Sequence, residues 1–186
     1  SRPLVLPLTA VVLLEDTADA STTAAKAVIW NSEGIPLSQA KSTYPLSTPQ
    51  PGWGEQNAED WWVATANSVR RAVQTVDTSR IAAISITHQR ETFVCVDKEN
   101  NPLRPAMLWL DSRAVAEVEE FGTERVHAIT GKPVNLTPAW YKLLWLQKNE
   151  PETLERTFRV TDVQGFIVNR LTGDWVTSYG SADPLG

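Results

Sequence analysis

Arg90 and Glu91 are adjacent in the sequence, a few residues after the β-branched run at 81–86. A guanidinium group donates hydrogen bonds and a carboxylate accepts them, so together they can hold neighbouring hydroxyl groups in a fixed orientation. In a strand the two side chains would point to opposite faces, whereas in a loop at a strand end both reach one ligand. A surface salt bridge is the alternative that these two residues alone leave open.

Trp109 and Asp111 are two further residues of suitable chemistry. An indole ring offers a face for the C–H groups of a ligand, and its bulk excludes water from its surroundings. A tryptophan of the hydrophobic core is the alternative for Trp109. Asp111 either contacts a ligand or caps the helix that follows it, and the sequence favours neither role.

The composition excludes several classes of protein. The chain has 186 residues, of which 42% are hydrophobic, enough for one domain with a substantial core. Its net charge of −5 and the lack of a basic run argue against binding to nucleic acid. The single cysteine, Cys95, excludes an internal disulfide and suits the reducing cytoplasm. The apolar run at 4–14 is too short to span a membrane.

The pattern of apolar residues predicts the elements that position these side chains. Strands are expected at 11–14, 26–30, 36–44, 81–86 and 93–96, the third running antiparallel to the second. Helices are expected at 58–76 after a cap at Asn57, at 113–129, at 138–149 after a cap at Thr137, and at 162–171 before Gly173. This order predicts an α/β domain in which helices flank a mixed sheet.

Six short motifs, in the same order along the chain, resemble the FGGY family of carbohydrate kinases, which includes glycerol kinase and xylulokinase. They are PGWGEQ at 51–56 with DWW at 60–62, ISITHQRET at 84–92, PLRPAMLWLDSR at 102–113, TG at 130–131, KLLWL at 142–146 and LTG at 171–173. The resemblance implies a ribonuclease H-like (actin-like ATPase) fold. It also implies that residues 1–186 form the N-terminal substrate-binding domain, and that the C-terminal nucleotide-binding domain lies outside them.

The resemblance also implies a site for a small sugar or polyol. Its substrate-binding residues would be Gln89, Arg90, Glu91, Trp109, Asp111 and Thr137. Thr137 takes the place of a larger, substrate-contacting tyrosine of glycerol kinase, so a tetritol, pentitol or ketopentose would fit as well as glycerol. The surrounding motifs point to both xylulokinase and glycerol kinase, and the choice of sugar stays open.

The segment DASTTAAK at 19–26 resembles the phosphate-binding hairpin of the family, with Ser21 where the family has glycine. Hydroxyl and backbone N–H groups at Ser21, Thr22 and Thr23 would hold ATP phosphate oxygens, and Lys26 would neutralise their charge. Asp19 would lie near Mg²⁺, through a water molecule. Serine resists the backbone conformations that glycine allows, so the loop is expected to be altered or impaired. An ordinary polar turn is the alternative.

The reaction implied is transfer of the γ-phosphoryl group of ATP to a primary hydroxyl, with Mg²⁺ as cofactor. In the family the general base is an aspartate of a motif that residues 1–186 do not contain, so we expect this chain alone to lack kinase activity. The alternatives are a non-catalytic sugar- or polyol-binding module, such as a pseudokinase, and an interaction domain without a ligand. The expected partners are the small-molecule substrate, a C-terminal kinase domain and other copies of the chain, with no membrane and no nucleic acid.

Overall fold

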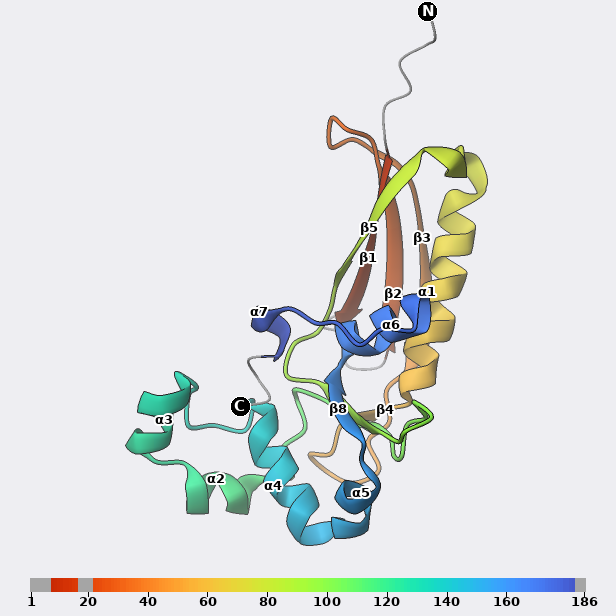
Figure 1. Cartoon of the computed structure of the whole chain (residues 1–186). Helices are drawn as coiled ribbons and strands as arrows, with labels where there is room; N and C mark the ends of the chain where they lie inside the picture. The colour runs from red at the N-terminus through yellow and green to blue at the C-terminus, as the bar shows by residue number, and fades with distance from the viewer. Residues whose placement is uncertain (1–7, 17–21, 183–186) are drawn as a thin grey trace, which may run out of the picture. The chain divides into compact units, whose positions relative to one another are not determined.

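The computed structural model describes residues 8–16 and 22–182, which divide into two compact units (Figure 1). The first unit comprises Ser1–Pro45 and Asp60–His88, and the second comprises Leu46–Glu59 and Gln89–Gly186. Each unit is built on its own 4-stranded sheet. The predicted α/β class is confirmed, but the strands form two sheets where the sequence suggested one.

The sheet of the first unit has the strand order β3-β2-β1-β5. Strands β1 (Leu8–Asp16), β2 (Thr22–Trp30) and β3 (Pro36–Pro45) form an antiparallel meander, and β5 (Ile81–Thr87) pairs with β1 in parallel. Asn31 fixes the turn between β2 and β3, because its side chain accepts the N–H groups of Glu33 and Ile35. These strands and the antiparallel third one confirm the sequence prediction.

Helix α1 (Ala58–Ala72) packs along this sheet through the apolar face that its sequence predicts. Ala72 lies in a buried cluster with Ala27 and Ile29 of β2. The Ser68 hydroxyl donates a hydrogen bond of 2.8 Å to the Ala25 carbonyl, which fixes the helix along the strand. The predicted helix was too long, since its last turn is a short 3₁₀ helix, Val73–Thr75, followed by another at Thr78–Arg80.

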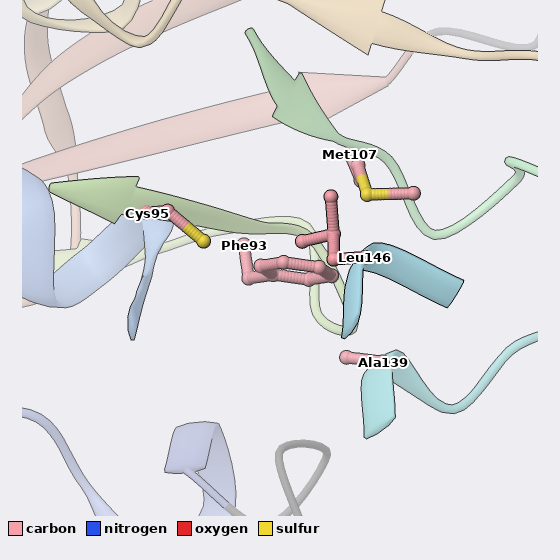
Figure 2. Close-up of a cluster of buried hydrophobic side chains, with 5 residues drawn as sticks. All are labelled: Phe93, Cys95, Met107, Ala139 and Leu146. Carbon is pink, nitrogen blue, oxygen red and sulfur yellow. The ribbon is translucent and has the colours of Figure 1, made fainter. Parts of the chain in front are cut away.

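The sheet of the second unit has the order β4-β7-β6-β8, and all its pairs are antiparallel. Its strands are β4 (Glu55–Gln56), β6 (Phe93–Val96), β7 (Ala106–Met107) and β8 (Arg159–Asp162). Every residue of β6 is buried, and Phe93 and Cys95 pack with Met107, Ala139 and Leu146 (Figure 2). Cys95 is a free cysteine and is 1% exposed, which confirms its interpretation as a small buried hydrophobe, and this burial raises the pKa of its thiol.

The second unit also holds the remaining helices. They are α2 (Val115–Phe121), α3 (Glu124–Thr130), α4 (Ala139–Asn149), α5 (Pro151–Arg156), α6 (Val163–Thr172) and α7 (Tyr179–Ala182). The single helix predicted at 113–129 is wrong, because Thr123 adopts an extended conformation and caps a new helix by accepting the N–H of Val126. Helix α6 confirms its prediction, with Asp162 as its cap and Gly173 in the left-handed conformation.

The predicted cap of α4 is also wrong. The N-cap is Pro138, it forms no side-chain cap hydrogen bond, and the helix starts one residue later than expected. Among the residues that the structure describes, no helix has both the length and the apolar character that crossing a membrane requires.

Candidate functional site

Three segments of the second unit meet around Glu91. The Glu91 backbone lies in the left-handed region, with φ of 64°, which is uncommon for a residue other than glycine. Its Oε2 atom accepts the N–H of Ala139, the first residue of α4, at 3.2 Å. The next residue, Thr92, accepts the N–H of Trp109 on its hydroxyl at 3.1 Å. The fold therefore joins the 89–92 loop to the start of α4 through Glu91 and to the main chain of Trp109 through Thr92.

The Glu91 carboxylate is partly withdrawn from solvent, with 13% of its side chain exposed. Its Oε1 atom lies 3.8 Å from Nζ of Lys132. Burial raises the pKa of Glu91, while Lys132 and the Ala139 N–H act in the opposite direction. A carboxylate held in this way keeps acceptor positions that the hydroxyl groups of a ligand can use.

The other predicted ligand contacts differ in exposure. Arg90 is exposed, and Trp109 is 41% exposed, which excludes the alternative of a core tryptophan. Gln89 is half-buried, and its side-chain nitrogen donates a hydrogen bond of 3.0 Å to the Gln56 side chain. This bond ties the 89–92 loop to β4, so Gln89 supports the loop that carries Arg90 and Glu91.

Asp111 has a different environment from these residues, because its side chain is completely buried. Its Oδ2 atom accepts the N–H of Gly54 at 2.7 Å, and both its oxygens accept hydrogen bonds from the Arg113 guanidinium. The predicted alternative of a helix cap is wrong, since the N-cap of α2 is Ala114 and has no side-chain cap bond. The geometry favours a structural role for Asp111.

Arg113 is the centre of a buried ion-pair network that joins several of the motifs. Its side chain is 1% exposed, and its Nη2 atom lies 2.8 Å from Glu55 and 2.7 Å from Asp111. Burial acts to lower the pKa of Arg113, but the bonds to Asp111 and Glu55 raise it above its ordinary value. The guanidinium also lies over the rings of Trp53, at 3.7 Å, and Trp145, at 5.0 Å. These tryptophans therefore support the site from within the unit.

Thr137 is half-buried, and its main chain is held by a residue that the sequence analysis did not single out. Lys142 is completely buried, and its Nζ atom donates to the carbonyl oxygens of Leu136 at 2.8 Å and Thr137 at 3.0 Å. Burial lowers the pKa of Lys142 to about 8, while Asp111 and Glu91 act to raise it. A lysine inside the apolar run KLLWL was the signal available in the sequence.

The residues predicted to bind phosphate belong to the first unit. Asp19 and Ser21 lie outside the described residues, and Thr22 and Thr23 are the first residues of β2. Lys26 is further along β2, where its pairing partner on β3 is Lys41. Within the described parts of the chain, no group of three or more His, Cys, Asp and Glu residues is placed to hold a metal ion.

Comparison with known proteins finds sugar and polyol kinases that are similar in sequence to this chain. The glycerol kinase of Thermococcus gammatolerans is 35% identical over 173 residues, which cover 88% of this chain and 35% of that protein. The xylulose kinase of Staphylococcus xylosus is 29% identical over 168 residues, again covering 88% of this chain and 35% of that protein. The chain thus spans about a third of the length of these relatives.

The fold is shared with solved sugar kinase structures. The xylulose kinase from Rhodospirillum rubrum superposes with a TM-score of 0.86 at 23% identity, covering 96% of this chain and 36% of that one. The fold is that of the actin-like ATPases, as the motifs implied. The model of the FGGY family of carbohydrate kinases, N-terminal domain, matches residues 17–184. The chain therefore belongs to the FGGY family of carbohydrate kinases.

Proposed function

We propose that this chain is the substrate-binding domain of a kinase that transfers the γ-phosphoryl group of ATP to a primary hydroxyl of a sugar or polyol. The observation that carries the proposal is the position of the Glu91 carboxylate, held by the Ala139 N–H beside the segment that contains Thr137. The exposed Trp109 donates its backbone N–H to the hydroxyl of Thr92, the residue that follows Glu91. The glycerol kinase and xylulose kinase relatives support this substrate class.

In this mechanism the second unit binds and orients the acceptor. Glu91 accepts hydrogen bonds from ligand hydroxyls and Arg90 donates to them, so one hydroxyl is held in line for transfer. Trp109 packs against the carbon backbone and excludes water from that hydroxyl. Positioning of this kind accounts for much of the catalysis in phosphoryl transfer, which needs little covalent chemistry from the protein.

The residues that would bind the nucleotide belong to the first unit. The backbone and hydroxyl groups of residues 21–23 and the ammonium of Lys26 would hold ATP phosphates, and Asp19 would lie near Mg²⁺. The metal ion would neutralise the charge that develops on the phosphate oxygens. We expect the nucleotide-binding domain and the general base outside residues 1–186, so this chain alone should not phosphorylate a polyol.

A non-catalytic sugar-binding module is the second candidate, because Ser21 stands where the family's phosphate loop has glycine. Mixing this chain with a C-terminal half from the family distinguishes the two. Recovery of ATP-dependent phosphorylation supports the kinase domain. Polyol binding without any recovered activity supports the binding module.

The binding site itself is tested by calorimetry with glycerol, erythritol, ribulose and xylulose. We expect at least one of them to bind, and E91Q to weaken that binding by at least about tenfold, because the charged acceptor is lost. The matched control is E119Q, a change of an exposed glutamate on α2 that we expect to leave the affinity unchanged. No binding of any of the four ligands to the wild-type chain would contradict the proposal.

The affinity should also depend on pH at the acidic end. Because burial raises the pKa of Glu91 above the ordinary value of 4.5, protonation sets in at a higher pH than for an exposed glutamate. Polyol affinity is therefore full when Glu91 is ionised and falls as the pH decreases through this raised pKa. Calorimetry between pH 4 and pH 7 measures the decrease, and E91Q should remove it. An identical decrease in E91Q would assign the effect to another group.

A further inference from the structure

We propose that Lys142 is a positioning residue of the sugar or polyol site, because its buried ammonium group fixes the 136–139 segment against Glu91. The inference rests on the proposed function for its ligand, but its structural part is tested separately below. Lys142 does not itself contact the ligand in this role. It acts through the main chain of Thr137 and Ala139.

The burial of Lys142 is the first observation. Lysine is almost never fully buried unless it is paired, because removing an ammonium group from water is expensive. Lys142 is 0% exposed, although it lies in an 11-residue helix whose other buried residues are Ala139, Tyr141 and Leu146. A leucine or methionine would fill this position without the free-energy cost of removing a charge from water. The charge therefore points to a role other than packing.

The hydrogen bonds of the ammonium group are the second observation. Nζ donates to the carbonyl oxygens of Leu136 and Thr137, the two residues just before the Pro138 cap. Pro138 has no N–H and no side-chain cap bond, so the start of α4 lacks the usual means of fixing it. Lys142 provides the missing restraint from within the first turn of the helix.

This restraint reaches Glu91 in one further step. The Ala139 N–H follows the restrained carbonyls directly and donates to Glu91 Oε2 at 3.2 Å. Ala139 itself is completely buried and packs with Phe93 (Figure 2). A shift of the 136–137 main chain would therefore move both the Thr137 side of the site and the donor that orients the Glu91 carboxylate.

The charges around Lys142 are the third observation. Asp111 and Glu91 attract the ammonium group, and Arg113 repels it. Its charge strengthens both hydrogen bonds to the carbonyls, since charge-assisted bonds are about twice as strong as neutral ones. Loss of the proton should therefore loosen the segment without removing any side chain.

The test compares K142M with K148M, which changes an exposed lysine of the same helix. For K142M we expect the dissociation constant of the polyol that binds the wild type to rise at least about tenfold, the usual effect of losing a charged hydrogen bond. Amide hydrogen exchange at Ala139 should become at least about tenfold faster, while K148M changes neither quantity. A folded K142M with wild-type affinity and wild-type exchange at Ala139 would overturn the proposal.

A second measurement needs no folded variant at position 142. In the wild type, the polyol dissociation constant should rise about threefold between pH 7 and pH 9.5, around the pKa of about 8 that burial gives Lys142. The K132M variant, which lacks the lysine facing Glu91, should keep this profile. A flat profile would refute the positioning role. If the wild type binds no polyol, the proposed function fails, and the exchange at Ala139 in K142M still decides the role of Lys142.

Discussion

Replacing Arg113 by methionine should lower the free energy of unfolding of the second unit by about 3–5 kcal/mol, the cost typical of breaking a buried ion pair. The guanidinium is bonded to Asp111, which is completely buried, and to Glu55, which is 8% exposed. Methionine fills much of the space but leaves the buried Asp111 carboxylate without its guanidinium partner and leaves Glu55 paired with Arg104 alone. Urea unfolding followed by tryptophan fluorescence measures the loss, because Arg113 lies over Trp53 and Trp145.

The control is R125M, a change of an exposed arginine on α3. Surface substitutions of this kind usually alter stability by no more than about 0.5 kcal/mol. A loss below about 1 kcal/mol in R113M would mean that the network contributes little net stability, as replacement of some buried ion pairs by apolar groups has shown.

Lys142 should make the free energy of unfolding increase with pH between about 8 and 10.5. Burial lowers its pKa from the usual 10.5 to about 8, so in this window the unfolded chain binds a proton that the folded chain has released. Stability therefore rises as the pH rises through the window, and the cost of the buried charge is fully present below it. The difference between 10.5 and about 8, at about 1.36 kcal/mol per pKa unit, amounts to about 3 kcal/mol.

The measurement is the free energy of unfolding of the wild type minus that of K142M at each pH. The subtraction is needed because burial raises the pKa values of Cys95 and Tyr141, and these groups make stability decrease at alkaline pH. We expect the difference to rise with pH by about 3 kcal/mol. A difference that stays constant from pH 7 to pH 10.5 would show that Lys142 is not buried as a charged group.

The regular elements of the fold could be predicted because their patterns are local. The apolar residues of β2 and the turn at 31–34 are visible within a few residues, and so is the apolar face of α1. The second sheet was harder, since β4 and β7 have two residues each and pair Glu55 with Met107, far apart in the sequence. Pairing at that separation leaves no local pattern.

The candidate site shows the same distinction between local and distant contacts. The chemistry of Arg90, Glu91 and Trp109 was visible from residue type, and their joint role in binding a ligand stays a prediction. The environment of Asp111 was not predictable, because one of its partners is a backbone N–H at Gly54. Lys142 was missed for a similar reason, since its partners are main-chain carbonyl oxygens, which every residue type has.

The left-handed backbone of Glu91 has an evolutionary consequence. Glycine, or to a lesser degree asparagine, would relax the backbone strain at φ of 64° but would remove the carboxylate that accepts the Ala139 N–H, so the backbone and the side chain favour different residues at this one codon. A lineage that no longer needs the ligand should accept glycine at position 91, because the relief of backbone strain then counts against the loss of the bond to Ala139 alone. Retention of glutamate in descendants would be a sign of continued selection for its carboxylate.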